Sequence, residues 1–261
     1  MIKDFQTILF QTENNIATLT LNRPDAANGI NPTLANELAQ AAMICDNDTT
    51  IRCVIITGSG RFFCAGGDLK AMSASDNPKM TLKGMADDLH KATSLFARMD
   101  KPTIVAVNGI AAGAGFSIAI AGDFVIAAQS AKFTMAYTAA GLSPDGSSTY
   151  YLPRLIGIRR AMELMITNRR ITAQEAVDWN LINRVVADDA VLSTAQKLAH
   201  QIASGPVDAF GIVKKLLLCS FNNSLETQME LEGRAISECA ISANGREGIQ
   251  AFLEKRQPNF T

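Results

Sequence analysis

The chain has 261 residues, 48% of them hydrophobic, and a formal net charge of −1 at pH 7. This length and composition predict a soluble globular protein with one large core and a smaller appended part. The balanced charge excludes the basic field by which proteins bind nucleic acids or anionic membranes, so we expect neither as a partner.

The cysteines and histidines indicate no metal site. Five cysteines are widely spaced in no metal-ligand pattern, and the two histidines, His90 and His200, are too few for a His-rich site. Unpaired thiols in odd number are typical of a reducing compartment, so a cytoplasmic location is expected. No targeting segment is expected at the start of the chain, and no apolar run reaches the length of a membrane span.

The first part of the chain predicts alternating strands and helices. Thr7–Phe10 and Ile16–Leu21 alternate as paired strands do, which predicts a hairpin. Asn31 and Pro32 predict the cap and the first residue of a helix, and apolar residues recur after them at helical spacing. Cys53–Thr57 then predicts a buried strand that ends in a glycine loop.

The order of buried strand and glycine-rich turn recurs in the middle of the chain. An apolar run through Val107 predicts a strand, the turn 108–115 follows it, and Phe116–Ala121 predicts the start of a helix. With a fainter repeat at Phe124–Ala128, this predicts a layered α/β fold whose strands deliver loops to one edge. Glycine turns expose backbone N–H groups, so this turn and Ala65–Gly67 together predict an oxyanion hole.

Helices dominate the rest of the chain. Residues 72–80 are polar and irregular, and a helix with an apolar face through 85–99 is expected after them. Pro153 is expected to break the chain, whereas Thr172 with Glu175 three residues on predicts a capped helix.

The C-terminal part is almost wholly helical in pattern from residue 188 onward. Pro206 is expected to start one helix, and Gly245 to separate the last two. We expect a core with the site over residues 1–200 and a helical oligomerisation region over 201–261. Apolar helix faces without a sheet to cover need another surface, which a second subunit supplies.

Several motifs in order resemble those of the enoyl-CoA hydratase/isomerase, or crotonase, superfamily. They are Phe63-Cys-Ala-Gly-Gly-Asp-Leu69, Lys101-Pro-Thr-Ile-Val-Ala-Val-Asn-Gly-Ile-Ala-Ala-Gly-Ala-Gly115, Ala131-Lys-Phe133, Leu142-Ser-Pro-Asp-Gly146, Leu152-Pro-Arg-Leu-Ile-Gly157 and Glu175-Ala-Val-Asp-Trp-Asn-Leu-Ile182. The resemblance covers nearly the whole chain and is strongest to the Δ3,Δ2-enoyl-CoA isomerases. It implies a spiral of ββα units with a helical C-terminal trimerisation region, a homotrimer or hexamer, and an acyl-CoA substrate.

The resemblance also implies where that substrate binds. By its motifs, the N–H groups of Gly67 and Ala114 form the oxyanion hole. Five residues would contact the CoA part, the C-terminal two from a neighbouring subunit: Arg23, Ala65, Asp68, Phe252 and Lys255. No separate cofactor is implied, because CoA is part of the thioester substrate.

The side chains expected around the hole favour an isomerase. In the family's hydratases two glutamates hold water, and the matching positions here are Ser117 and Tyr137, which cannot act as carboxylate bases. Asp145 matches the acid of the family's isomerases, and one carboxylate can take a proton from C2 and return it to C4. On the residues alone, Pro144-Asp145-Gly146 is more simply a β-turn, in which an aspartate needs no catalytic role.

His90 keeps a second reaction open. By default it is a half-exposed surface histidine, yet it matches the base of 4-chlorobenzoyl-CoA dehalogenases, whose nucleophile matches Asp145. Those enzymes enclose an aryl ring with aromatic side chains, whereas this sequence has Leu82 and Leu89 in the flanking helix and Tyr137 in place of a tryptophan. We therefore rank isomerase first, hydrolytic dehalogenase second and hydratase third. A non-catalytic, RNA-binding member would need a basic helix face, which the sequence lacks.

Overall fold

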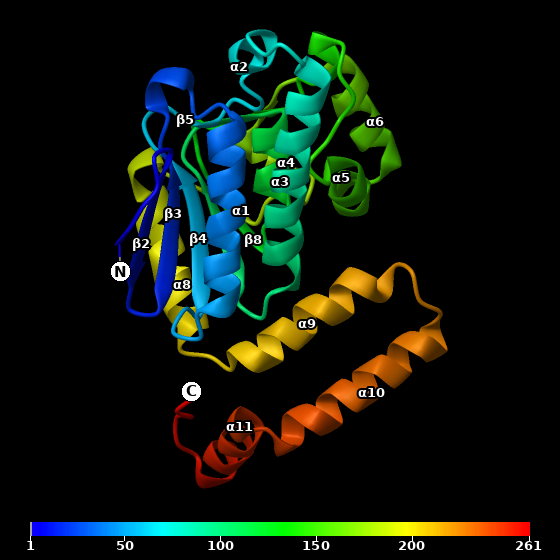
Figure 1. Ribbon diagram of the computed structural model, residues 1–261. Helices are drawn as coiled ribbons and strands as arrows, with labels where there is room; N and C mark the ends of the chain where they lie inside the picture. Colours follow the sequence, from blue (N-terminus) through cyan, green and yellow to red (C-terminus); the bar gives the residue numbers. More distant parts are fainter. Residues whose placement is uncertain (1) are drawn as a thin grey trace.

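The computed structural model describes residues 2–261 and contains two β-sheets with helices around them (Figure 1). The larger sheet is antiparallel along its first three strands and parallel beyond them. Its seven strands are, in spatial order, β1 (Ile2–Asp4), β2 (Ile8–Glu13), β3 (Ile16–Leu21), β4 (Cys53–Gly58), β6 (Thr103–Val107), β8 (Phe124–Ala128) and β11 (Arg184–Val186). The predicted N-terminal hairpin is confirmed as β2 and β3.

The smaller sheet supplies a second, shorter strand after each of three long ones. Its strands are, in spatial order, β10 (Ile171–Thr172), β9 (Lys132–Thr134), β7 (Ile110–Ala112) and β5 (Phe62–Cys64). Along the chain, β4 and β5 lead to α2 (Leu69–Ser73) and α3 (Pro78–Arg98), β6 and β7 to α4 (Ala114–Ile120), and β8 and β9 to α5 (Ser148–Ile156). This repetition is the predicted succession of ββα units.

Helix α1 (Pro32–Asn47) forms where the sequence predicts it. The Asn31 side chain accepts a hydrogen bond from the Leu34 N–H at 2.9 Å, and Pro32 is the first helical residue. One face of the helix is buried, at Leu34, Ala35, Leu38, Ala39, Ala41, Ala42 and Cys45. In Figure 1, α1 and α3 stand side by side in front of the larger sheet, and α8 (Val191–Ala203) packs on β4, β6 and β8 behind it.

Two predicted breaks in the helical part were wrong. Pro153 lies inside α5. Proline has no N–H to donate to the Thr149 carbonyl, but Thr149 is exposed, so that carbonyl can bond to solvent and the helix continues. Gly245 lies inside α11 (Ala243–Glu254), which begins after Ser242 as its cap. The glycine is needed for close packing, since a side chain at 245 would strike the Cys239 carbonyl.

The segment 72–80 is also more regular than predicted. Helix α2 ends within it, and α3 begins at Pro78, with Asn77 accepting from the Met80 N–H at 3.2 Å. The capped helix at Thr172 is confirmed as α7 (Ala173–Asp178), preceded by α6 (Ile158–Thr167). Short 3-10 turns cover Pro24–Ala26, Thr138–Ala140 and Asp188–Ala190.

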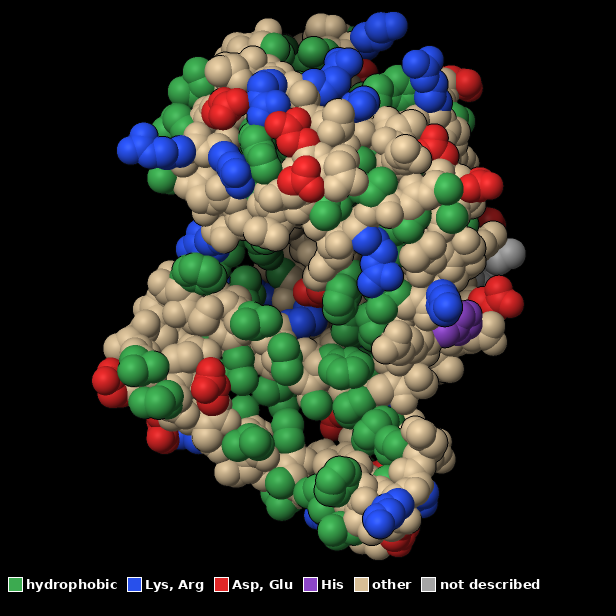
Figure 2. Space-filling model, turned by 180° about the vertical axis from the view of Figure 1, so that it is seen from behind, with side chains coloured by type: hydrophobic (Ala, Val, Ile, Leu, Met, Phe, Trp, Pro, Cys, Tyr) green, Lys and Arg blue, Asp and Glu red, His purple; other side chains and the backbone are tan. Residues whose placement is uncertain are grey.

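Three C-terminal helices extend away from the core: α9 (Val207–Ser220), α10 (Leu225–Ile241) and α11 (Figure 1). No residue of α10 is buried. Figure 2 shows hydrophobic side chains gathered over this part of the molecule and a hollow between it and the core. The exposed large apolar residues of the three helices are Val213, Leu217, Leu225, Met229, Leu231, Ile236, Ile241, Ile249, Phe252 and Leu253. None of the helices within residues 2–261 is both long and apolar enough to cross a bilayer.

A buried lysine fastens α9 to the core. Nζ of Lys214 donates to the carbonyls of Phe96 and Lys101 at 2.8 and 2.9 Å, and it pairs with Asp123 at 2.8 Å. Burial raises the pKa of Asp123 although the ammonium group opposes that shift. All three ammonium donors are thus used, and α9 is held against the end of α3.

Candidate active site

The turns that follow β5, β7 and β9 carry the predicted site residues. Gly67, Ala114 and Tyr137 lie within three residues of the carboxyl ends of these strands. Since the strands are parallel neighbours, their carboxyl ends meet at one edge of the sheet. The first two turns touch, because a Cβ added at Gly66 would lie 2.9 Å from the Ala112 carbonyl oxygen and 3.4 Å from the Ala114 nitrogen.

Two backbone amides are left free at this edge. Ala114 begins α4, two residues earlier than predicted, so its N–H has no acceptor within the helix. Within residues 2–261, neither this N–H nor that of Gly67 donates a hydrogen bond to a protein acceptor. The Met72 side chain lies against Gly67, where an added Cβ would meet its Cε at 2.5 Å. Both amides can therefore donate to an oxygen of a bound molecule in partly apolar surroundings.

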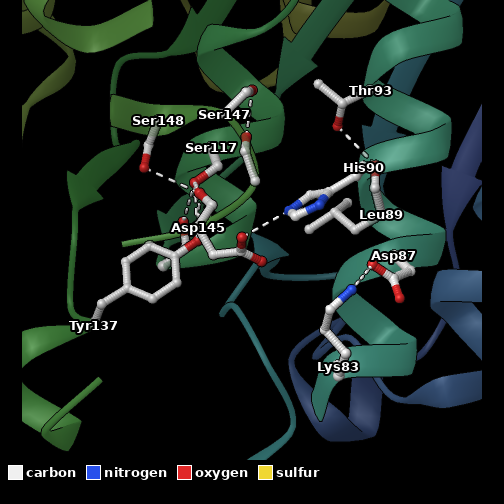
Figure 3. Close-up of polar contacts among 12 residues, drawn as sticks. Lys83, Asp87, Leu89, His90, Thr93, Ser117, Tyr137, Asp145, Ser147 and Ser148 are labelled. Atoms are coloured by element: carbon white, nitrogen blue, oxygen red, sulfur yellow. Dashed lines mark hydrogen bonds and ion pairs between the residues drawn. The ribbon is translucent and has the colours of Figure 1, made fainter. Parts of the chain in front are cut away.

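Three hydroxyl groups surround the backbone carbonyl of Asp145 (Figure 3). Ser117 Oγ, Ser148 Oγ and the Tyr137 hydroxyl lie 2.8, 3.0 and 3.1 Å from its oxygen and are placed to donate to it. Burial raises the pKa of Tyr137 far above its ordinary value, so the phenol remains a donor. Gly146 follows with φ of +63°, and a Cβ there would lie 3.0 Å from that of Ser117. This hydroxyl cluster, Ser117, Tyr137 and Ser148, fixes the backbone from which the Asp145 side chain extends.

The carboxylate of Asp145 points toward α3 (Figure 3). Its Oδ1 lies 2.7 Å from Nε2 of His90, and no backbone N–H within residues 2–261 donates to either of its oxygens. The two side chains are partly accessible, 38% exposed for Asp145 and 49% for His90. An aspartate that serves only a turn bonds to its own backbone. The geometry is instead that of an acid and a base in position to share a proton.

Arg23 and Asp68 bind each other beside the first glycine turn. Their ion pair measures 3.0 Å, and the Arg23 guanidinium also donates to the Gly29 carbonyl. Asp68 caps α2 by accepting from the Ala71 N–H at 3.2 Å. Although burial acts in the opposite direction, these contacts lower the pKa of Asp68. With exposed Ala65, three residues predicted to contact CoA lie together, and that contact stays a prediction.

The other two predicted CoA contacts lie elsewhere in the chain. Phe252 is 83% exposed on α11, and Lys255 follows directly after that helix. Figure 1 places α11 at the end of the molecule opposite α2. One chain therefore does not bring these residues to the strand ends.

Known proteins resemble this chain over nearly its whole length. The model of the enoyl-CoA hydratase/isomerase family matches residues 11–261. The chain belongs to the enoyl-CoA hydratase/isomerase family. Within that family, the 1,2-epoxyphenylacetyl-CoA isomerase of Escherichia coli (strain K12) is 41% identical over 97% of this chain and 98% of its own. A probable enoyl-CoA hydratase of Rhodobacter capsulatus is 40% identical over 98% of both chains.

A solved structure confirms the predicted fold class. The crystal structure of an enoyl-CoA hydratase from Polaromonas sp. JS666 matches with a TM-score of 0.92 and 36% identity, over 97% of this chain and 99% of that one. The protein is therefore an acyl-CoA enzyme of the enoyl-CoA hydratase/isomerase family. Because its relatives are named for both isomerisation and hydration, family membership does not fix the reaction.

Sequence reasoning missed the hydroxyl cluster. In the sequence, Ser117 and Tyr137 were considered only as positions without a glutamate, and Ser148 was assigned no role. Their shared target is a backbone carbonyl 28 residues from Ser117, and side chains that converge on a carbonyl leave no spacing pattern in the sequence. The single available signal was that both positions retain a hydroxyl.

Replacing Tyr137 with phenylalanine should lower kcat about fivefold and leave KM nearly unchanged, because losing one net hydrogen bond of ~1 kcal/mol loosens Asp145. The other two hydroxyls still satisfy the carbonyl, so the fold should persist. Steady-state kinetics and thermal unfolding provide the measurements. Thr57→Val is the matched control, since that hydroxyl donates to the Ala106 carbonyl at 2.8 Å. Equal kinetic losses in both variants would contradict the assigned role.

Proposed function

We propose that the protein is an acyl-CoA isomerase that moves a double bond from the 3 to the 2 position of an enoyl thioester. Asp145 takes a proton from C2, which lies next to the thioester carbonyl, and returns it to C4. Both carbons belong to one short allylic unit, so a single carboxylate can reach them in turn. The intermediate is a dienolate whose negative charge lies largely on the thioester oxygen.

The amides of Gly67 and Ala114 stabilise that oxygen in this proposal. Both N–H groups lack an acceptor within residues 2–261 and follow neighbouring parallel strands. A fixed donor aimed at developing charge is worth about 3–4 kcal/mol in a water-poor site. Two such donors would lower the barrier to forming the dienolate enough for a weak base to remove the C2 proton.

The Asp145–His90 contact of 2.7 Å is the observation that supports the proposal most strongly. Oδ1 of Asp145 is occupied by His90, and Oδ2 has no hydrogen-bond partner within residues 2–261, which leaves that oxygen for substrate. The backbone of Asp145 is held by the hydroxyl cluster, so the carboxylate has a defined position. Such preorganisation is what proton abstraction from carbon requires.

Hydration is less well supported, although several relatives are named hydratases. In the resemblance, hydratases hold water with glutamates at the positions of Ser117 and Tyr137. Here both hydroxyls lie within hydrogen-bond distance of the Asp145 carbonyl and, at 2.9 Å, of each other, so their protons are used within the protein. No carboxylate is available there to activate a water molecule.

The Asp145–His90 pair favours a second candidate, hydrolytic dehalogenation of an aryl-CoA. In that reaction Asp145 would attack the halogen-bearing carbon and His90 would activate the water that releases the product. The same contact serves both reactions, so the substrate must decide between them. The E. coli relative adds a third candidate substrate, because its name specifies 1,2-epoxyphenylacetyl-CoA.

We also propose that the C-terminal helices pack against further copies of the chain, as a trimer or hexamer. Their exposed apolar residues need a partner surface. In such an assembly Phe252 and Lys255 would approach a neighbour's Arg23 and Asp68, where the CoA part would bind. The catalytic residues would then lie in the core of residues 1–200, and residues 201–261 would form the contacts between subunits.

Four thioesters test the proposed reaction: 3-enoyl-CoA, 2-enoyl-CoA, 4-chlorobenzoyl-CoA and 1,2-epoxyphenylacetyl-CoA. The expected result is conversion of 3-enoyl-CoA to 2-enoyl-CoA without hydration of the latter. Chromatography of the products measures both reactions. Chloride release that depends on His90 would establish the dehalogenase instead. Turnover of the epoxide alone would retain an isomerase but change its substrate class.

A further inference from the structure

His90 lies between two different environments. On one side its Nε2 contacts Oδ1 of Asp145 at 2.7 Å. On the other side the residue lines a cavity of about 540 Å³ between α3, α5 and α9. Figure 3 shows the imidazole extending from α3 toward Asp145, with Thr93 one turn further along the same helix. The ring therefore borders both the acid and the cavity.

The cavity is separate from the predicted oxyanion donors. Its lining includes His90, Thr93, Ser94, Ser147, Tyr150 and Lys215. Gly67, Ala114 and Asp145 do not line it. Imidazole, hydroxyl and ammonium groups stand among apolar side chains in its lining, and it is many times larger than one water molecule requires, so water can occupy it. Of the Asp145–His90 pair, therefore, only His90 belongs to the cavity lining.

A proton taken up by Asp145 has two possible destinations. One is the substrate carbon facing Oδ2, and the other is the imidazole at Oδ1. With an acyl chain over Oδ2, direct contact between that oxygen and solvent is blocked. The His90 side chain is 49% exposed, and exposed side chains change rotamer within picoseconds to nanoseconds.

We propose that His90 passes the shuttled proton to water in this cavity during each turnover. The inference rests on the proposed isomerase function. The C2–H bond breaks, its electron pair enters the dienolate, and the proton goes to Oδ2 of Asp145. While Asp145 is a carboxylate, the Nε2–H of His90 donates to Oδ1. Once the acid is neutral, exchange with cavity water moves that ring proton from Nε2 to Nδ1, so Nε2 can accept the acid proton. The imidazolium ring turns toward the cavity, exchanges its N–H proton with water and returns. Asp145 then delivers a solvent-derived proton to C4, and no other reactant is consumed.

This assignment differs from both ordinary roles of a histidine at this place. A surface histidine would have no effect on the isotopic content of the product. A residue that only orients Asp145 would change the rate but not the origin of the proton. Isotope content therefore distinguishes proton exchange from positioning, which kinetics alone do not.

The test is isomerisation of unlabelled 3-enoyl-CoA in D₂O, with deuterium at C4 of the 2-enoyl-CoA measured by mass spectrometry and NMR. Wild-type enzyme is expected to incorporate about one deuterium per turnover, because histidine exchanges protons readily near neutral pH. In His90→Gln the incorporation should fall about tenfold while isomerisation continues, since the amide can bond to Asp145 but cannot carry its proton.

His200→Gln is the matched control, because His200 is an exposed residue of α8 on the other side of the sheet. It should behave as wild type. Equal deuterium content in wild type and His90→Gln would overturn the proposal, as would wild-type product without deuterium at C4. Because His90 is half exposed on its helix, glutamine leaves no cavity in the core, and thermal unfolding checks the fold of the variant.

A saturated thioester separates this inference from the proposed function. Deuterium wash-in at C2 of butanoyl-CoA requires proton abstraction and exchange but no double bond. If 3-enoyl-CoA is not isomerised, the isomerase proposal fails, and wash-in that needs both Asp145 and His90 still supports the exchange route. Wash-in that needs Asp145 but is unchanged in His90→Gln and His90→Asn rejects that route even if isomerisation is found.

Discussion

Replacing Asp145 with asparagine is expected to lower kcat for 3-enoyl-CoA isomerisation by about 10²–10⁴, the range associated with loss of general acid–base catalysis. Asparagine has nearly the same shape and can still accept a hydrogen bond from Nε2 of His90. It cannot take up the C2 proton at neutral pH. The hydroxyl cluster binds the backbone of residue 145, so the loop should keep its place and KM should change little.

The matched control is Asp87→Asn. Asp87 is on α3 with His90 but is an exposed residue that pairs with Lys83 (Figure 3). An exposed i,i+4 pair contributes about 0.3–0.5 kcal/mol to stability, so this variant should retain wild-type kinetics. Initial rates of 2-enoyl-CoA formation measure both variants. An Asp145→Asn enzyme within a few-fold of wild type on all four thioesters would mean that the base lies elsewhere.

Local signals in the sequence predicted much of the fold. Asn31 and Pro32 mark the start of α1 because capping and a fixed proline φ act within a few residues. Thr172 marks the start of α7 in the same way. The strand before each glycine turn was recognisable because fully buried parallel strands are continuous apolar runs. These features depend on neighbours in sequence, so a single chain is enough to predict them.

Features that depend on distant neighbours were not predictable in this way. Asp145 is 55 residues from His90, and the sequence alone left both a turn former and a surface histidine as the simpler interpretations. Gly245 looked like a break because its contact with Cys239, although the two are close in sequence, arises only where the chain turns between α10 and α11. The resemblance, not periodicity, indicated which residues would meet. Neither the resemblance nor the periodicity predicted the contacts between side chains and a backbone carbonyl that form the hydroxyl cluster.

In the proposed isomerase, the hydroxyl cluster also connects the sequence difference at positions 117 and 137 to the choice of reaction. Hydration needs a held water and a base beside the enoyl group, whereas isomerisation needs one mobile proton and no water at the reacting carbons. Ser117 is fully buried, and Tyr137 is half-buried beside it. Their hydroxyls use their capacity to hold the acid in place. The residues at these two positions would therefore decide between the reactions: glutamates hold a water molecule, whereas hydroxyl groups hold the backbone of Asp145.

Replacing Ala114 with proline is expected to lower kcat by about 10²–10³, the loss measured when one oxyanion donor is removed elsewhere. Ala114 is the first residue of α4, a position where proline is tolerated because its N–H has no helical acceptor. Gly113 before it has φ of 51° and ψ of −125°, outside the helical region that a following proline disfavours. The helix should thus form without the amide hydrogen.

Ala114→Gly separates the donor from its surroundings, because it keeps the N–H and removes only the methyl group. Glycine at this position should stay within a few-fold of wild type, whereas proline also places a ring carbon where the substrate oxygen would approach. Kinetics on 3-enoyl-CoA and deuterium wash-in on butanoyl-CoA should fall together in Ala114→Pro, since both pass through the enolate. Loss of isomerisation with unchanged wash-in would mean that this amide acts after enolate formation, and full activity in the folded proline variant would place the thioester oxygen away from α4.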